Sequence, residues 1–274
     1  GGFGTGSTIG RKEHTITTAQ NNHSRSHHCD SKGKLYVVGL GPGNPLDRTC
    51  RAVKAIEDSS VVAGYTPYIK SIADLTDGKE IIVSGMRQEV ERCRAALARA
   101  AEGAVVSMVS SGDPGVYGMA GLILEMADSE KIDVTIEIIP GISAANTAAS
   151  RLGAPLMLDY ACISLSDLMV SWDRIRRRIE LIAEADMVLA LYNPRSIKRI
   201  SQLEETVAIM LKHRPPGTRC GIVTAISTRE ESVLFTTLGE LLDKDINMRS
   251  LVVIGNSDTR EIAGRLVTTR GYRF

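Results

Sequence analysis

The sequence lacks the long apolar run that a membrane span requires. A spanning helix needs roughly 18 or more consecutive apolar residues, and polar side chains interrupt every shorter run of this 274-residue chain. The first residues also lack a basic segment followed by an apolar one, which is the pattern of a secretory signal. Hydrophobic residues make up 43% of the chain, enough for the core of one or two domains. We therefore expect a globular, cytoplasmic protein that does not bind a membrane.

Net charge is also nearly absent, since the formal charge at neutral pH is only +1. A near-neutral chain is not typical of a protein that binds nucleic acid, although a local basic patch can still face an acidic small molecule. Cysteine pairs are missing as well, because the five cysteines are scattered and form no C-x-x-C motif. Neither a zinc site nor a disulfide framework is indicated, so we expect reduced thiols.

Residues 1–33 differ from the rest of the chain. They are rich in Gly, Ser, Thr, Asn and His and have almost no apolar periodicity, so we predict a flexible N-terminal extension. His23, His27, His28 and Cys29 are residue types that bind metals, but no adjacent core would fix their geometry. We therefore predict no metal site.

From residue 34 onward, short β-branched runs alternate with helical patterns, which indicates an α/β fold with parallel strands covered by helices. We predict two α/β domains, 34–156 and 157–274, with a ligand cleft between them. The boundary follows a predicted helix at 142–152, where Gly153, Ala154 and Pro155 break the pattern. The last strands are close enough in sequence for antiparallel pairing. The predicted strands are 35–39, 60–63, 104–109, 134–139, 161–165, 187–191, 220–225, 232–237 and 251–254.

A glycine loop follows the first predicted strand, in the segment YVVGLGPGNPLD at 36–47. Dinucleotide sites have the pattern G-x-G-x-x-G, but here Asn44 replaces the third glycine, and Pro42 has no backbone N–H. The acidic pair Glu57 and Asp58 precedes the next apolar run, so we interpret it as a helix end. Taken alone, the loop fits a phosphate site, a site for another adenosyl ligand, or a structural turn.

Three further loops follow predicted strands, at 110–115, 140–144 and 192–196. Ligands of α/β proteins usually bind at the carboxyl ends of strands and in clefts between domains, so we expect these loops to line one edge. The triplet Asp113-Pro114-Gly115 is also typical of an ordinary turn. The position of this triplet, more than its composition, suggests a ligand.

The segments GLGPGNP, SSGDPGVYG, PGISAANTAASRLGAPL and LALYNPRS, in this order, resemble the tetrapyrrole methylase family, which uses S-adenosylmethionine. The resemblance covers nearly everything after residue 34. The segments GYTPYI at 64–69, SGMRQEVERC at 84–93, SLSDLMVSW at 164–172 and VVIGNS at 252–257 look like its precorrin-3B C(17)-methyltransferase and cobalt-factor III methyltransferase branch.

The resemblance implies a homodimer that methylates carbon 17 of a ring-contracting tetrapyrrole in cobalamin biosynthesis. It also implies a cleft in which S-adenosylmethionine is bound. A proline-interrupted loop agrees with a donor that lacks phosphates, since such a donor needs close backbone approach. The residues implied to contact the donor are Pro42, Ser111, Gly112, Asp113, Val116, Tyr117, Ser143, Ala144, Tyr192, Asn193, Ala225 and Ile254.

The implied acceptor is an anionic tetrapyrrole, which predicts a basic rim on the cleft. Arg195, Lys198 and Arg199 follow a strand-end loop and are the candidates, although a solvated helix start also explains them. The denser run 174–178 is predicted to face water, and Trp172 to anchor its helix in the core. We assign no catalytic residue.

Two other functions remain open at the level of the sequence. One is a non-catalytic sensor or carrier that binds adenosylmethionine or a tetrapyrrole, because binding and methyl-transfer residues are largely the same when positioning dominates catalysis. The other is a nicotinamide or flavin oxidoreductase, which the missing third glycine disfavours. The sequence also leaves open whether the acceptor contains cobalt or is metal-free.

Overall fold

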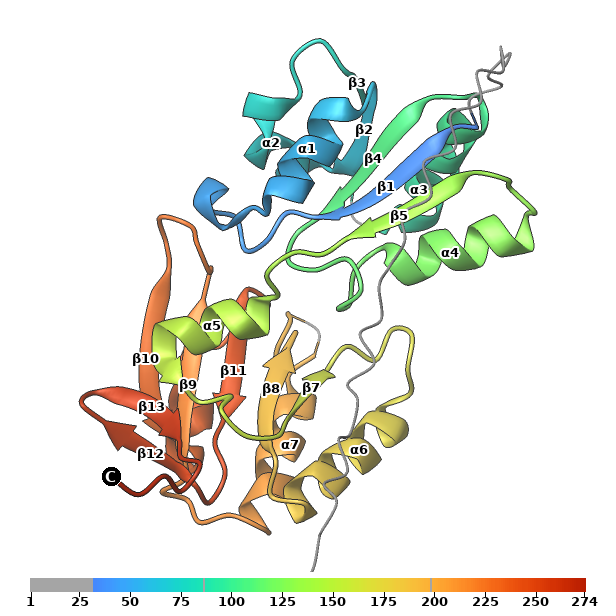
Figure 1. The fold of residues 1–274 in the computed structure, drawn as a ribbon. Coiled ribbons are helices and arrows are strands. Elements are labelled where there is room, and N and C mark those ends of the chain that lie inside the picture. The colour runs from blue at the N-terminus through green and yellow to red at the C-terminus, as the bar shows by residue number, and fades with distance from the viewer. Residues whose placement is uncertain (1–31, 86, 198) are drawn as a thin grey trace, which may run out of the picture. The chain divides into compact units, whose positions relative to one another are not determined.

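The computed structural model describes residues 32–85, 87–197 and 199–274 (Figure 1). The first sheet has five parallel strands in the order β3-β2-β4-β1-β5. Four of these strands confirm the prediction, whereas β3, an edge strand whose Ile81 and Val83 are exposed, was not predicted. The strands are β1 (Lys34–Gly39), β2 (Val61–Tyr65), β3 (Glu80–Ser84), β4 (Val105–Ser110) and β5 (Thr135–Ile139).

Helices cover both faces of the first sheet, as the continuous apolar strands require. Helices α1 (Cys50–Asp58) and α2 (Thr66–Ser71) lie on one face, in a cluster that includes Val38 and Ile56. Helices α3 (Glu89–Ala101) and α4 (Ala120–Ser129) lie on the other, with Leu97. The end of α1 at Asp58 confirms the predicted helix end. The 3-10 helices of this region are η1 (Pro45–Asp47) and η2 (Ala73–Leu75).

The second sheet has the order β10-β9-β11-β8-β7. Strands β7 and β8 are parallel, whereas β11 is antiparallel to both β8 and β9, and β10 is antiparallel to β9. The prediction of antiparallel pairing among the last strands is therefore confirmed. The strands are β7 (Tyr160–Ser164), β8 (Val188–Tyr192), β9 (Arg219–Thr224), β10 (Ser232–Thr237) and β11 (Ser250–Ile254).

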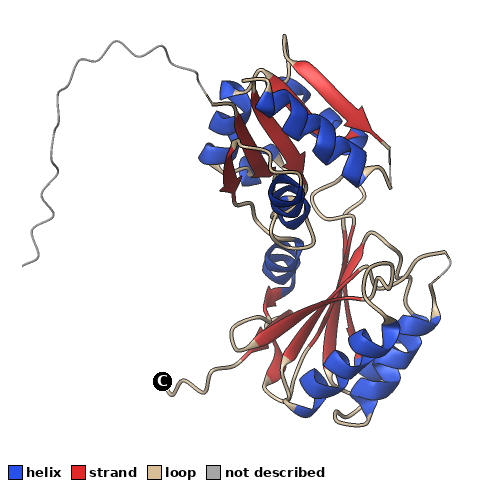
Figure 2. Cartoon of the chain, turned by 90° about the vertical axis from the view of Figure 1, so that its right-hand side faces the viewer, coloured by secondary structure: helices blue, strands red, loops and turns tan. Residues whose placement is uncertain are grey.

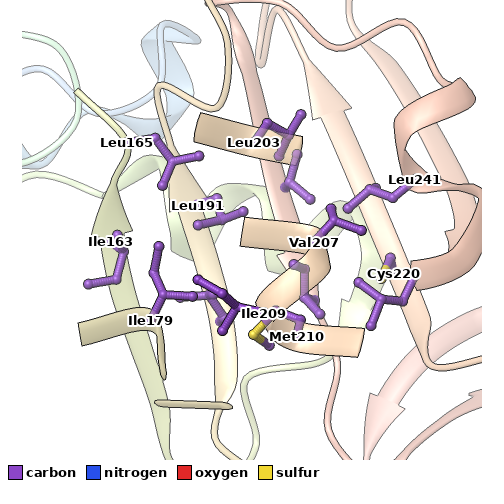
Figure 3. Close-up of a cluster of buried hydrophobic side chains, with 14 of the residues drawn as sticks. Ile163, Leu165, Ile179, Leu191, Leu203, Val207, Ile209, Met210, Cys220 and Leu241 are labelled. Carbon is purple, nitrogen blue, oxygen red and sulfur yellow. The ribbon is translucent and has the colours of Figure 1, made fainter. Parts of the chain in front are cut away.

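One face of the second sheet is covered by α6 (Trp172–Glu184), α7 (Ser201–Leu211) and the 3-10 helix η3 (Leu238–Asp243). Figure 2 shows α6 and α7 on the same side of this sheet. Figure 3 shows the buried cluster between them, in which Ile179 of α6 and Val207 of α7 lie near Leu191 of β8.

The basic run in α6 makes ion pairs, and Trp172 anchors this helix. Arg176 lies 3.4 Å from Asp173 and 3.6 Å from Glu205, and the Trp172 indole Nε1 donates to the Glu205 carboxylate at 2.6 Å. Arg174, Arg177 and Arg178 are exposed and Trp172 packs against the buried cluster of the second sheet, which agrees with both predictions. Among the described residues, no helix is long and apolar enough to cross a membrane.

Helix α5 (Ala144–Leu152) packs on the other face of the second sheet (Figure 1). Leu152 lies so close to β9 that a Cβ on Gly221 would be 2.4 Å from its Cδ2 atom. Strand β6 (Gly153–Ala154) then pairs with β13 (Arg265–Thr268), which in turn pairs with β12 (Thr259–Ile262).

The packing of α5 and β6 argues against a domain boundary after residue 156. Gly153 and Ala154 form a strand, with Gly153 at a φ of 130°, so the Gly-Ala-Pro break is not a free linker. Helix α5 packs against the second sheet, and β6 belongs to a separate three-stranded sheet with β13, whose Leu266 lies in the same buried cluster as α5. We therefore propose that the division between the two α/β units lies at 140–143, between β5 and α5.

Candidate functional site

Three loops at the carboxyl ends of β1, β4 and β5 touch each other through backbone atoms. Gly41 and Gly112 exchange two hydrogen bonds, of 3.1 and 2.7 Å. A Cβ on Gly39 would lie 2.6 Å from the Gly112 carbonyl oxygen, and one on Gly141 only 2.1 Å from it. Only glycine permits this approach. Pro42, half-buried, follows Gly41 in the chain and therefore adjoins the 111–113 loop.

The glycine loop does not lead into a helix N-terminus as a dinucleotide site does. After Gly43 the chain forms η1, and the Asn44 side chain accepts from the Leu46 N–H at 3.0 Å. Helix α1 begins only at Cys50, and Thr49 caps it by accepting from the Ala52 N–H at 3.0 Å. The first amides of α1 are therefore not presented by the glycine loop, which argues against a pyrophosphate site there.

Asp113 joins two of the loops through both oxygens of its carboxylate. Oδ1 accepts from the Gly115 N–H at 2.8 Å, and Oδ2 accepts from the Gly141 N–H at 3.1 Å. Helix α4 begins only at Ala120, so Asp113 closes a turn and does not cap that helix. An ionised carboxylate has about four acceptor positions, so capacity remains for a ligand.

Tyr117 connects the loop after β4 to the second sheet. Its ring lies 5.0 Å from the ring of Tyr192, and its hydroxyl donates to the Cys162 carbonyl oxygen at 3.1 Å. Its backbone φ is 55°, an unusual value for a bulky residue. Burial raises the pKa of its hydroxyl, which therefore stays protonated near neutral pH. The neighbouring Val116 is exposed.

Tyr192, at the end of β8, contacts the start of α5. Its hydroxyl oxygen accepts from the Ala145 N–H at 2.9 Å, while Ser143 caps the same helix by accepting from the Asn146 N–H at 3.3 Å. Burial raises the pKa of the Tyr192 hydroxyl. Asn193 has a φ of 49°, and its side-chain amide donates to the Ser164 hydroxyl at 3.0 Å. Residues 143–144 and 192–193 are thus neighbours, as predicted.

The two remaining residues predicted to contact the donor, Ala225 and Ile254, lie in different places. Ala225 follows β9 with a φ of 54°, and its loop approaches the glycine loop, since a Cβ on Gly43 would lie 3.7 Å from the Ser227 Cβ. Ile254 is fully buried and pairs with Leu189, which lies three residues before Tyr192 along β8. Because β11 is antiparallel to β8, its end is at the opposite edge, and the structure does not bring Ile254 to the other candidates.

Of the residues predicted to form a basic rim, Arg199 makes hydrogen bonds within its own loop. The Arg199 guanidinium donates to the Asn193 carbonyl oxygen at 2.7 Å, and Ser196 and Arg199 exchange backbone hydrogen bonds of 3.0 and 3.2 Å. Arg195 is half-buried in the same loop. Lys198 lies outside the described residues. The basic loop is adjacent to Asn193, and helix α7 begins just after it, at Ser201.

Sequence reasoning missed a pocket of about 250 Å³ beside the loop after β4. We call it the Arg92 pocket. Segments 64–69 and 84–93 supply much of its polar lining. Both segments carry the family resemblance, but none of the residues that they contribute to the pocket was predicted as a site residue. A cavity of about 430 Å³ lies elsewhere, beside the end of α7 and the start of β9, and is away from the strand-end loops. The Arg92 pocket is lined by Tyr65, Tyr68, Glu89, Arg92, Ser110 and Ser111, among others.

No group of three or more His, Cys, Asp or Glu residues in the described part of the chain is arranged to hold a metal ion. The His and Cys cluster at 23–29 lies outside the described residues. What the strand-end loops bring together is backbone N–H and C=O groups, hydroxyls and one carboxylate. Such a set suits a compact polar ligand with little negative charge.

Sequence comparison gives a consistent family. Residues 34–242 match the profile of the Tetrapyrrole (Corrin/Porphyrin) Methylases. A probable cobalt-factor III C(17)-methyltransferase of Salmonella typhimurium is 41% identical over 87% of this chain and 99% of its own. A precorrin-3B C(17)-methyltransferase of Sinorhizobium is 38% identical over 83% of this chain and 91% of its own. A cobalt-factor III methyltransferase of Priestia megaterium is 44% identical, but this chain spans only 46% of its length.

Comparison with solved structures also finds tetrapyrrole methyltransferases. The crystal structure of the methyltransferase CobJ superposes with a TM-score of 0.81 at 34% identity, covering 86% of this chain and 100% of its own. A uroporphyrin-III C-methyltransferase from Thermus thermophilus, solved as a complex with S-adenosylhomocysteine, has a TM-score of 0.63 at 24% identity. It covers 81% of this chain and 97% of its own, and shows the shared fold alone.

Proposed function

This chain belongs to the tetrapyrrole (corrin/porphyrin) methylase family, and from this premise we propose that it methylates carbon 17 of a tetrapyrrole in cobalamin biosynthesis. The methyl donor is S-adenosylmethionine, and the acceptor is of the precorrin-3B or cobalt-factor III type. One observation carries the proposal: loops from the strand ends of both sheets meet at the Tyr117–Tyr192 contact. This chain spans about half the length of the longer relatives, such as the Priestia megaterium protein. The proposal therefore does not extend to any further activity of those longer proteins.

The contacts favour an adenosyl donor over a dinucleotide. The glycine loop presents no helix N-terminus to a pyrophosphate, because η1 and the Thr49 cap follow it. A sulfonium donor instead needs close backbone approach and neutral or acidic partners. The glycine contacts supply the first, and the hydroxyls and the Asp113 carboxylate supply the second.

Methyl transfer is a displacement in which a ring carbon forms a bond to the methyl group as the sulfur–methyl bond breaks. The sulfur keeps the electron pair and becomes neutral. Most of the demand on the protein is alignment, which can supply several kcal/mol of the barrier (about 7–11 in well-oriented systems). We propose that two residues orient the donor: Tyr192, whose hydroxyl accepts from the Ala145 N–H of α5, and Ser143, which caps α5. We also propose that Asp113 stabilises the positive charge of the donor.

The acceptor carries several carboxylates, so a basic rim is expected beside the donor. We propose Arg195 and Arg199 for this role, since their loop adjoins Asn193, and we retain Lys198 as a prediction. Methylation is proposed to accompany ring contraction, for which no residue is assigned.

We also propose a homodimer in the cytoplasm. Strand β10 is an edge strand whose Val233, Leu234 and Phe235 are all more than a third exposed, and an apolar edge favours pairing with a second copy. The four cysteines in the described part are free thiols, which agrees with a reducing compartment. Light scattering during gel filtration measures the oligomeric state, and a monomer at micromolar concentration would overturn the dimer.

The test of function is incubation with S-adenosylmethionine carrying a trideuterated methyl group. The cobalt-containing and the metal-free ring precursors are supplied separately, and the product is analysed by mass spectrometry. Label on one precursor supports the methyltransferase and identifies the acceptor. Tight donor binding without transfer to either would favour a sensor or carrier, and binding of NADH but not of the donor would favour an oxidoreductase.

A further inference from the structure

The Arg92 pocket has no role in the proposed function, although it adjoins the candidate donor site. It shares Ser111 and Tyr117 with that site. Tyr65 ends β2, Tyr68 lies in α2, Arg92 lies in α3, and Ser110 ends β4. The pocket therefore lies at the carboxyl edge of the first sheet, where ligands of parallel sheets bind.

Two buried polar groups line this pocket without a partner. Arg92 is only 5% exposed; one of its terminal nitrogens donates to the Ser84 hydroxyl at 2.5 Å, whereas its Nε has no partner among the described residues. Ser110 is also 5% exposed, and its hydroxyl has none in the same part of the chain. Leaving a buried donor unpaired costs about 1–3 kcal/mol, so these two groups point to a ligand that satisfies them.

The charges of the pocket favour an anion beside Arg92. Arg92 and Glu89 are the charged residues among those lining it. Arg92 is buried, whereas Glu89 is only half-buried and accepts from the Arg87 N–H at 3.3 Å. A partly exposed charge is screened by solvent more than a buried one. A guanidinium and a hydroxyl, both donors, suit a carboxylate.

The walls of the pocket suit the apolar stem of such a group. The rings of Tyr65 and Tyr68 are edge to face, with centroids 5.3 Å apart. Aromatic walls contact methylene groups well. The volume of about 250 Å³ is several times the roughly 30 Å³ that one water takes in the liquid, which leaves room for a short acid arm.

We propose that the Arg92 pocket binds one peripheral carboxylate arm of the tetrapyrrole acceptor. This proposal rests on the proposed function, whose substrate carries such arms. The arm lies against the packed rings of Tyr65 and Tyr68, and its carboxylate accepts hydrogen bonds from the Arg92 Nε and the Ser110 hydroxyl. Anchoring one arm fixes the rotation of the macrocycle, so the pocket determines which ring carbon faces the donor.

The test compares Arg92→Gln and Ser110→Ala with Arg94→Gln, a control on the same helix whose exposed side chain pairs with Glu130. Tetrapyrrole affinity is titrated by absorbance without the donor, and donor affinity by calorimetry. Loss of a charged hydrogen bond predicts a roughly 10-fold or larger rise in the tetrapyrrole Kd for Arg92→Gln, with the donor Kd unchanged. The control should match the wild type.

Ser110→Ala separates binding from folding. The Ser110 hydroxyl has no described partner, so its removal should leave the urea midpoint unchanged or higher, yet raise the tetrapyrrole Kd by about five-fold. Wild-type affinity in both pocket variants, with methyl transfer intact, would overturn the pocket proposal and leave the proposed function standing. If the wild type transferred no methyl group, yet the two pocket variants selectively lost tetrapyrrole binding, the pocket proposal would be supported and the proposed function would not.

Discussion

Glycine residues at 39, 112 and 141 make the closest backbone contacts of the candidate site. Gly141→Ala would place a Cβ 2.1 Å from the Gly112 carbonyl oxygen, and backbone cannot yield as a side chain does. We expect a loss of about 1–3 kcal/mol in unfolding free energy and weaker donor binding, measured by urea denaturation and calorimetry. The control is Gly121→Ala in α4, where the new Cβ meets nothing within 4 Å. This control should be neutral or stabilising, by up to about 1 kcal/mol.

The Asp113 carboxylate is a second residue-scale test, because both of its oxygens accept backbone hydrogen bonds. Asp113→Asn keeps the shape but loses the charge and places an amide donor in the position of one accepting oxygen. We expect donor affinity to fall by roughly 10-fold or more, measured by calorimetry. Asp77→Asn, at an exposed position, is the control. An unchanged donor Kd in Asp113→Asn would remove Asp113 from the donor site.

At the scale of elements, the contact between β8 and α5 joins two candidate segments. Tyr192→Phe would leave the Ala145 N–H, which is buried, without its acceptor. An unpaired buried donor predicts a loss of about 1–3 kcal/mol, measured by urea denaturation. Tyr160→Phe, which changes an exposed ring, should lie within about 0.5 kcal/mol of the wild type. Equal stability of the two variants would contradict the role of Tyr192.

Local sequence patterns predicted the strand-end loops but not the positions that depend on strand pairing. Glycines and prolines after apolar runs predicted the strand-end loops, because those residues mark chain reversals directly. Ile254, a residue implied by the family resemblance, lies away from the other candidates because β11 runs antiparallel to β8, and no local sequence pattern records strand direction within a mixed sheet. The Arg92 pocket was missed for a related reason. Its residues come from β2, α2, α3 and β4, which only the fold brings together.

At the scale of the whole molecule, buried thiols predict a loss of stability in alkali. Burial raises the pKa of Cys93 to about 11 and that of Cys220 to about 12, from 9.0. Below pH 9 both thiols are protonated in the folded and unfolded states. Above it the unfolded chain loses these protons first, so stability should fall by up to about 1.4 kcal/mol per pH unit for each thiol.

The measurement is the urea midpoint from pH 7 to 10.5. Cys220→Ala should reduce the alkaline slope, whereas Cys50→Ala, which replaces an exposed thiol, should not. An identical slope in Cys220→Ala and the wild type would contradict this linkage.

The central claim concerns the whole molecule: strand-end loops from both sheets hold S-adenosylmethionine so that one ring carbon lies behind its methyl group. A single-turnover reaction with donor carrying a ¹³C-methyl group, followed by ¹³C NMR of the tetrapyrrole, tests this most directly. We predict one enriched methyl resonance, bonded to carbon 17. Label at another ring carbon, or no enriched product from either the cobalt-containing or the metal-free precursor, would contradict the account.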